Sequence, residues 1–302
     1  MQTGKILSTP ESCFEDLKDY PFQPHFVTTD NLQIHYVDEG PFDARPVLLL
    51  HGVPAWSYLY RHLIRNISKT GTRVVAPDLI GFGKSDKPGE AKFHTYQSHV
   101  EWITEFINIL NLKEITLFCH DWGSLIGLRI AAMHPDLFTG IIVSNGMLPT
   151  GEYRINPTFK LWKFFARYSP FIPVDYVIES GVIHGLDKEE KRAYRAPFPS
   201  SEYKAAIRAL PSRVPIFKND PESVFNRKLW ESLEKWEKPF LTVFSNKDPI
   251  TSGGDIYMQK RIPGAAGQDH IKLDAGHFIQ EDSRKELAEI INRFHKKTVT
   301  EP

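Results

Sequence analysis

One strand–turn–helix segment most narrowly limits the folds open to this chain. Residues 114–118 form a short apolar run typical of a β-strand, and residues 124–133 have the pattern of a helix. The turn between them carries Asp121, with Cys119 and Gly123 as small residues on either side. This arrangement is typical of a sharp turn that exposes a nucleophilic side chain at the edge of a parallel sheet. We therefore expect Asp121 to be a nucleophile.

A carboxylate at such a turn performs different chemistry from a serine hydroxyl. It attacks saturated carbon that bears a leaving group, and it leaves an ester on the enzyme which water must then cleave. The sequence therefore favours displacement at an alkyl carbon over the hydrolysis of ordinary esters.

Further apolar runs predict the rest of the sheet. Residues 46–50, 73–76 and 140–143 are continuous apolar runs, as expected for strands that are buried on both faces of a parallel sheet. Helical patterns lie between them, the clearest at residues 100–110, and a hairpin is expected at residues 26–37. Strands that alternate with helices predict an α/β fold with a mostly parallel, doubly wound sheet.

The alternation stops between residues 149 and 220, where aromatic, basic and proline residues accumulate in helical patches. We predict that residues 149–220 are a helical cap inserted into a core domain of residues 1–148 and 221–302. After the cap we expect a helix at 222–236, strands at 239–244 and 270–273, and a closing helix around 287–294.

The composition is that of an ordinary globular protein. Among 302 residues, 37 basic side chains balance 37 acidic ones, so nothing in the overall charge indicates nucleic acid or an anionic membrane as a partner. Residues 1–10 lack the apolar core of a signal peptide, and the two cysteines, Cys13 and Cys119, are expected to be reduced thiols. We expect a cytoplasmic monomer.

One glycine-rich segment imitates a phosphate-binding loop. Residues 81–85 read Gly-Phe-Gly-Lys-Ser, but Asp78 stands where the motif requires its first glycine. We find no metal-binding or nicotinamide-binding motif, and we expect no cofactor and no metal.

Two further residues complete a possible catalytic triad with Asp121. His277 follows the last expected strand, where a general base belongs in this chain order. Asp248 follows the strand at 239–244 and would fix the tautomer of His277. The structural alternative for Asp248 is a simple Asp–Pro turn.

Backbone and indole N–H groups complete the expected site. The backbone N–H groups of Val53 and Trp122 would form an oxyanion hole for the ester. The indole of Trp122 is a donor without an acceptor and therefore suits a departing halide. Trp162, in the cap segment, is either a second donor of this kind or a packing residue.

Taken together, these residues resemble the haloalkane dehalogenases of the α/β-hydrolase superfamily. The resemblance covers nearly the whole chain and is densest in residues 51–61, 76–88, 120–123, 196–199 and 274–281. It implies the α/β-hydrolase fold and the conversion of short haloalkanes to a primary alcohol, halide and a proton through an ester on Asp121.

The resemblance also implies roles within the cap. It favours Trp162 as the second halide donor and Phe159 as a wall of the substrate pocket. Phe164 and Phe165 are further expected pocket residues in the same aromatic stretch.

The chain departs from the family at two positions. Val53 stands where this subfamily usually has Glu, and His120 replaces the Gln more often seen before the nucleophile. An epoxide hydrolase is the alternative, because it would use the same triad. It would also need tyrosines in the cap as acids for the departing alkoxide. The cap offers Tyr153, Tyr168, Tyr176, Tyr194 and Tyr203. A non-catalytic binding protein on this fold is a second alternative, against which the intact triad argues.

Overall fold

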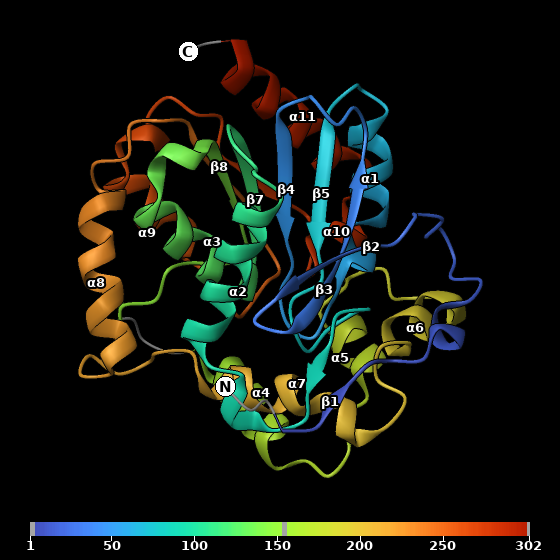
Figure 1. Ribbon diagram of the computed structural model, residues 1–302. Helices are drawn as coiled ribbons and strands as arrows, with labels where there is room; N and C mark the ends of the chain where they lie inside the picture. The colour runs from blue at the N-terminus through green and yellow to red at the C-terminus, as the bar shows by residue number, and fades with distance from the viewer. Residues whose placement is uncertain (1–3, 153–155, 301–302) are drawn as a thin grey trace.

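A computed structural model describes residues 4–152 and 156–300. Its centre is an eight-stranded sheet in the order β10-β9-β8-β7-β4-β5-β3-β2 (Figure 1). The strands from β10 to β5 run parallel, while β3 pairs antiparallel with β5 and β2 antiparallel with β3. The predicted mostly parallel sheet is confirmed. Its strands are β2 (His25–Thr29), β3 (Leu32–Glu39), β4 (Pro46–Leu50), β5 (Arg73–Pro77), β7 (Ile115–His120), β8 (Phe138–Ser144), β9 (Phe240–Ser245) and β10 (Ile271–Leu273).

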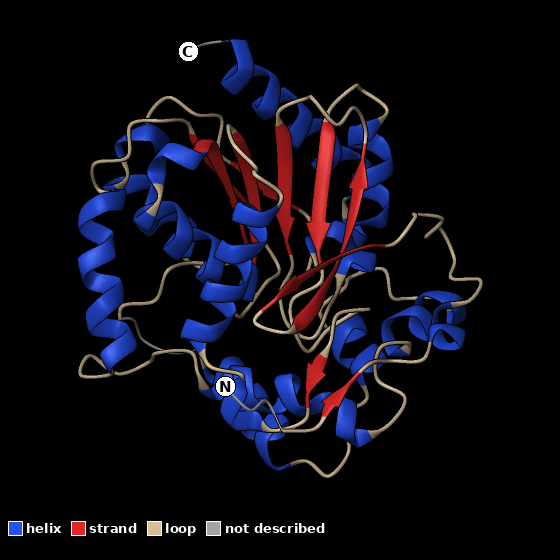
Figure 2. Cartoon of the chain, viewed as in Figure 1, coloured by secondary structure: helices blue, strands red, loops and turns tan. Residues whose placement is uncertain are grey.

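Helices cover both faces of the sheet, as the alternating pattern predicted (Figure 2). On one face α1 (Arg61–Ser68) packs against α11 (Arg284–Thr300). On the other face α3 (Trp122–Met133) packs against α2 (Tyr96–Ile109) and α8 (Pro221–Leu233). The two remaining helices of this part are α9 (Gly254–Arg261) and α10 (Ile279–Asp282).

The buried strands explain the continuous apolar runs. All five residues of β4 are buried, because helices exclude water from both faces of the central strands. The hairpin between β2 and β3 is confirmed. Its turn residues Asp30 and Asn31 have φ values of 47° and 62°, the left-handed conformation that two-residue hairpin turns require.

The segment around Asp121 differs from the prediction at both ends. Strand β7 continues to His120, which pairs with Ser144 of β8, and helix α3 already begins at Trp122. Only Asp121 therefore separates strand from helix. The apolar run alone predicted a longer turn, because it ends at Phe118. The polar His120 nevertheless belongs to the strand, since it pairs with Ser144 of β8.

A group of helices lies at the carboxyl ends of β4 and β5, toward which the arrowheads of these strands point in Figure 1. The group comprises α4 (Pro157–Tyr168), α5 (Val174–Ser180), α6 (Lys188–Arg195) and α7 (Ala205–Ala209).

None of the helices in the described part of the chain has the length and apolar composition needed to cross a membrane.

The N-terminal arm lies against these helices. Strand β1 (Ile6–Leu7) pairs with β6 (Lys87–Pro88) to form a separate small sheet, drawn next to α7 in Figure 1. The Thr9 hydroxyl donates to the carbonyl of Pro197 over 2.8 Å. The arm thus fastens the helices to the rest of the molecule.

Candidate active site

The turn at Asp121 is strained and closely packed. Asp121 has φ 49° and ψ −122°, outside the usual regions for a residue with a side chain. A side chain at Gly123 would place its Cβ 2.0 Å from the carbonyl oxygen of Leu50, so only glycine lets the turn press against β4. The Asp121 backbone N–H donates to the carbonyl of Asn145 over 3.2 Å. These contacts present the Asp121 carboxylate at the carboxyl edge of the sheet.

The loop after β4 supplies a hydrogen-bond donor to this carboxylate. The backbone N–H of Val53 donates to Asp121 Oδ1 over 2.8 Å. A Cβ at Gly52 would lie 2.4 Å from that same oxygen, so glycine is needed for the loop to approach this closely. The loop is fixed from behind, because His51 Nε2 accepts from the backbone N–H of Leu79 over 2.9 Å.

The glycine-rich segment that imitates a phosphate-binding loop wraps a carboxylate instead. The backbone N–H groups of Ser57 and Lys84 donate to the buried Asp78 over 2.7 and 2.8 Å. His35 Nδ1 lies 2.7 Å from the same carboxylate. These N–H groups bind the Asp78 carboxylate rather than a phosphate. The hydrogen bonds join the loops behind the site to one another.

His277 lies between Asp121 and Asp248. Its Nε2 is 3.6 Å from Asp121 Oδ2, and its Nδ1 is 3.1 Å from Asp248 Oδ2. Asp248 is buried and accepts from the backbone N–H of Ile250 over 2.8 Å and from the hydroxyl of Thr251. The structure thus brings together the three residues that the sequence selected, although Asp121 is more than a hundred residues from the other two.

The charges of the three groups are coupled. Burial opposes ionisation of both carboxyl groups, but the adjacent imidazole outweighs it and lowers the pKa of Asp121 and of Asp248. Burial also opposes a charge on His277, yet Asp248 and Asp121 raise its pKa to about 10. At neutral pH the resting site therefore contains two carboxylates and one imidazolium.

Two residues outside the predicted set hold the backbone of His277. Asn145 Nδ2 donates to the carbonyl oxygen of His277 over 2.9 Å, and His120 Nε2 lies 2.8 Å from the same oxygen. Because a carbonyl only accepts, His120 must carry its proton on Nε2. Burial lowers the pKa of His120 to about 4, so its ring is neutral. Its ring centroid lies 4.8 Å from that of His277, which it supports from one side.

A cavity of about 940 Å³ opens above Asp121 and His277. Val53, Trp122, Phe159 and Trp162, four of the candidate site residues, line it, while the buried Asp248 stands behind His277. Such a volume is at the upper end of the range for small-molecule sites. Most of the other walls are apolar and include Leu125, Met147, Val177, Val214, Ile216 and Phe278.

Two predicted pocket residues are placed elsewhere. Phe164 does not line the cavity; it lies on the outer side of α4 and is 64% exposed. Phe165 is half-buried behind Trp162, with the ring centroids 6.2 Å apart, and it does not line the cavity either. The aromatic stretch is helical, so its residues point in different directions and only some of them can reach one cavity.

The tyrosines that an epoxide hydrolase would need do not line the cavity where they are described. Tyr168 and Tyr176 are exposed, and Tyr203 packs at the edge of the core. Tyr194 is buried and donates its hydroxyl to Glu281. Tyr153 lies outside the described residues.

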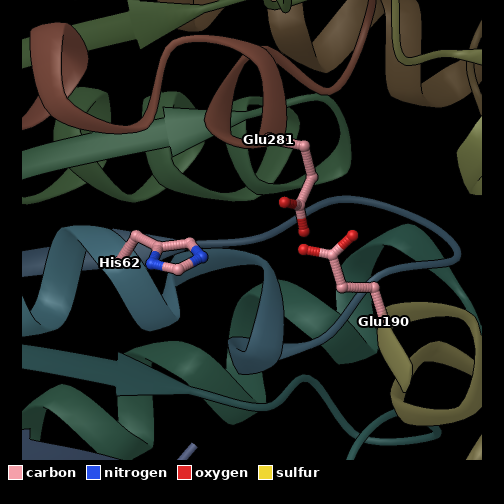
Figure 3. A group of neighbouring side chains, drawn as sticks. All are labelled: His62, Glu190 and Glu281. Atoms are coloured by element: carbon pink, nitrogen blue, oxygen red, sulfur yellow. The ribbon is translucent and has the colours of Figure 1, made fainter. Parts of the chain in front are cut away.

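A cluster of His62, Glu190 and Glu281 has the composition of a metal site (Figure 3). Both carboxylates are already paired, however. Arg61 contacts Glu190 and Glu281, and Arg284 contacts both of them over 2.7 Å. Two carboxylates that face two guanidinium groups are balanced in charge, so the cluster is a buried ion-pair network that joins α6 to α1, α10 and α11.

The parallel sheet and the nucleophile turn define an α/β hydrolase, and the family model described as the alpha/beta hydrolase fold matches residues 45–283. A haloalkane dehalogenase from Mycolicibacterium paratuberculosis (strain ATCC BAA-968 / K-10) is 50% identical over 291 residues, which cover 95% of this chain and 97% of that protein. The chain belongs to the haloalkane dehalogenase family.

Two further similarities agree with this assignment. A haloalkane dehalogenase from Psychrobacter cryohalolentis is 48% identical over 296 residues, which cover 96% of this chain and 98% of that protein. The solved structure of a haloalkane dehalogenase from Paraglaciecola agarilytica NO2, described as tetrameric, matches with a TM-score of 0.89 and 32% identity. That match covers 95% of this chain and 97% of the other.

Proposed function

We propose that the protein hydrolyses apolar haloalkanes to an alcohol, halide and a proton through an ester on Asp121. One observation carries the proposal. An ionised aspartate stands at the base of an apolar cavity, 3.6 Å from a histidine that could activate water and 2.8 Å from a backbone donor.

In the first step an oxygen of Asp121 attacks the carbon that bears the halogen. A carbon–oxygen bond forms as the carbon–halogen bond breaks, and the electron pair of that bond leaves with the halide. We propose that the indole N–H groups of Trp122 and Trp162 stabilise the halide as its charge develops. The apolar cavity supports this step, because it excludes water that would otherwise solvate the nucleophile.

In the second step water cleaves the ester. Esterification removes the negative charge of Asp121, which is one of the two charges that raise the pKa of His277. The imidazolium then loses its proton more readily, and the neutral ring can take a proton from water. The resulting hydroxide attacks the ester carbonyl, and the backbone N–H groups of Val53 and Trp122 stabilise the oxyanion. The bond between the carbonyl carbon and the alkyl oxygen then breaks as His277 returns the proton to the departing oxygen, and the alcohol leaves. The regenerated carboxylic acid of Asp121 passes its proton to His277, so the net proton released is the one that the imidazolium lost to solvent. Asp248 keeps His277 oriented.

We further propose that residues 149–220 act as a cap which closes the cavity over the substrate. The support is that α4 supplies Phe159 and Trp162 to the cavity wall, whereas the triad comes from loops of the sheet. The cavity volume admits longer chains than the short haloalkanes expected from the sequence. A cytoplasmic monomer remains part of the proposal, and sedimentation analysis tests its oligomeric state against the tetramer described for the Paraglaciecola relative.

The decisive experiment measures halide release from 1-bromobutane and 1-bromohexane, with epoxides of matched size as the alternative substrates. We expect release from both bromides and no epoxide hydrolysis. His277→Ala should form the ester but not cleave it, so mass spectrometry should detect an alkyl adduct on Asp121. His25→Ala, which changes an exposed histidine, is the matched control and should turn over normally.

Three outcomes would contradict the proposal. These are an unmodified His277→Ala protein after incubation with substrate, full activity in Asp121→Asn, and hydrolysis of epoxides without release of halide from bromides. The last result would favour the epoxide hydrolase.

A further inference from the structure

Helix α4 is apolar on two opposite sides. Its inner side supplies Phe159 and Trp162 to the cavity. Its outer side carries Leu161, Phe164 and Tyr168, which are 68%, 64% and 61% exposed. A surface helix normally has one apolar stripe, and a helix that is apolar all round is normally buried all round. The apolar side chains on the outer side of α4 are typical of a surface that another molecule covers, yet here they are exposed.

Three of the exposed side chains form one continuous patch. Leu161, Phe164 and Tyr168 are spaced by three and four residues, so they share one face of the helix. The rings of Phe164 and Tyr168 have centroids 5.0 Å apart. Phe171, just beyond the helix, is 67% exposed. We call these four residues the outer face of α4; contiguous exposed apolar side chains of this kind mark interaction sites.

Cations accompany this face. Residues 153–174 contain no Asp or Glu but four basic residues, Arg154, Lys160, Lys163 and Arg167. Lys160 and Arg167 are exposed and stand four and three residues from Phe164, so they flank the face, and Lys160 also lines the cavity. The Arg167 guanidinium carbon lies 5.3 Å from the ring centroid of Tyr168.

The acidic groups close to α4 do not neutralise its outer face. Asp175 is buried and pairs with Arg195 over 3.1 Å. Asp220 interacts electrostatically with Lys163, which is only half exposed and does not share the three- and four-residue spacing of the face. The outer face is therefore apolar, and the exposed cations Lys160 and Arg167 lie beside it.

We propose that the outer face of α4 docks on an anionic lipid surface. Aromatic and aliphatic side chains flanked by Lys and Arg are the composition of helices that lie in a membrane interface. A second copy of the chain fits less well, because a two-fold contact would bring the cations of one α4 against those of the other.

Docking in this way would place the cavity next to a lipid phase, since the opposite side of the same helix lines the cavity. Apolar haloalkanes dissolve in lipid and would reach the site from there; this benefit alone rests on the proposed function. The net charge of zero over 302 residues gives no sign of this surface. The local sequence does, because residues 153–174 contain no Asp or Glu.

Co-sedimentation of the full chain with vesicles tests the proposal. We expect binding to vesicles of equimolar phosphatidylglycerol and phosphatidylcholine, weaker binding to phosphatidylcholine alone, and loss of binding as salt is added. The double variant Leu161→Ser/Phe164→Ser should lower the partition coefficient about tenfold or more, because it removes two apolar side chains from the contact.

Phe42→Ser is the matched control. Phe42 is 78% exposed and lies in the loop before the amino end of β4, away from α4, so its loss should not change vesicle binding. Halide release without vesicles reports the chemistry separately, and it should be equal in all three proteins because neither Leu161 nor Phe164 lines the cavity.

Equal binding to neutral and anionic vesicles, or equal binding by the double variant and the wild type, would overturn the proposal. So would a dimer of the wild type that the double variant abolishes in sedimentation experiments, since the outer face would then be an interface between copies. A halide-releasing enzyme that does not bind vesicles refutes the docking surface alone, whereas vesicle binding without halide release refutes the proposed function alone.

Discussion

A single residue, Asp121, changes the properties of its neighbour during the proposed reaction. As a free carboxylate it helps to hold the proton on His277, and as an ester it no longer does so. One imidazole can then serve as a cation that stabilises the resting nucleophile and later as a base. Asp248 stays ionised throughout, because its lowered pKa keeps its charge at neutral pH.

The first prediction concerns Asp248→Asn. The pKa of His277 should fall well below about 10, because the variant removes a charge that raises it. Hydrolysis of the ester should slow by about 10⁴-fold, since the imidazole also loses the group that fixes its tautomer. An NMR titration of the His277 ring measures the pKa, and mass spectrometry measures accumulation of the alkyl adduct.

Asp274→Asn is the control for this variant. It removes the same charge from an exposed residue three positions before His277, where Lys247 is its partner. Its effect on the pKa of His277 should be small, because solvent screens the exposed carboxylate. Similar pKa shifts in the two variants would show that Asp248 has no special coupling to His277.

The proposed reactive residues could be selected from the sequence, but the residues that hold them could not. Asp121, His277 and Asp248 each follow a predicted strand, and parallel strands bring their carboxyl ends to one edge. Asn145 also follows a strand, but as an amide it does not fit the role of the triad acid, and its side chain instead holds the carbonyl of His277. His120 was noted only as a departure from the family. Both act through contacts between distant segments, which a single sequence does not display.

At the scale of elements, helix α6 is anchored to the sheet domain by charge. Glu190, on α6, accepts from Arg61 of α1 over 2.9 Å and from Arg284 of α11 over 2.7 Å. Glu281 joins the same two guanidinium groups from α10, four residues after His277. The network therefore fixes α6 and the backbone that follows the proposed base.

The second prediction compares two glutamates on α6. Glu190→Ala should lower the free energy of unfolding by about 3–5 kcal/mol, because it leaves Glu281 as the only carboxylate facing two guanidinium groups, one of which, Arg61, is fully buried. Glu189→Ala removes an exposed pair with Arg192 and should cost less than about 1 kcal/mol. Urea unfolding of both variants measures the difference. Equal effects would show that the buried network adds nothing to stability.

Elements with long apolar runs were predictable, and short ones were not. The strands at 46–50 and 73–76 were placed to within a residue, because burial on both faces leaves a continuous signal. Strands β1 and β6 have two residues each and no pattern of their own; they form only because the arm reaches the loop before α2. Helix α9 was missed because its sequence is mostly polar and it buries only Gly254, Asp255 and Met258.

At the scale of the whole molecule, buried histidines set how stability responds to acid. Burial lowers the pKa of four of them to about 4, below the ordinary value of 6.5. The unfolded chain therefore binds more protons than the folded chain between these values, and the stability from these groups is lost as the pH falls through that interval. The four residues are His62, His94, His120 and His295.

His277 acts in the opposite direction. Its folded pKa of about 10 lies above the unfolded value, so its contribution is complete below pH 6.5 and is lost as the pH rises toward 10. The third prediction is therefore that the urea midpoint is greatest near neutral pH and falls on both sides. His277→Ala should flatten the alkaline decline but leave the acid decline. A midpoint that rises steadily from about pH 6.5 to pH 4 would contradict the assignment of neutral buried histidines.

The end of helix α11 lies far from the cavity mouth. The Arg45 side chain, at the amino end of β4, donates to the carbonyl of Val299 over 3.3 Å, whereas Asp121 stands at the carboxyl edge of the same sheet (Figure 1). An enzyme tethered to a solid support through this helix would present its entrance to the passing solution. Coupling through the lysines around α4 would instead turn the entrance toward the resin and slow the supply of reactant.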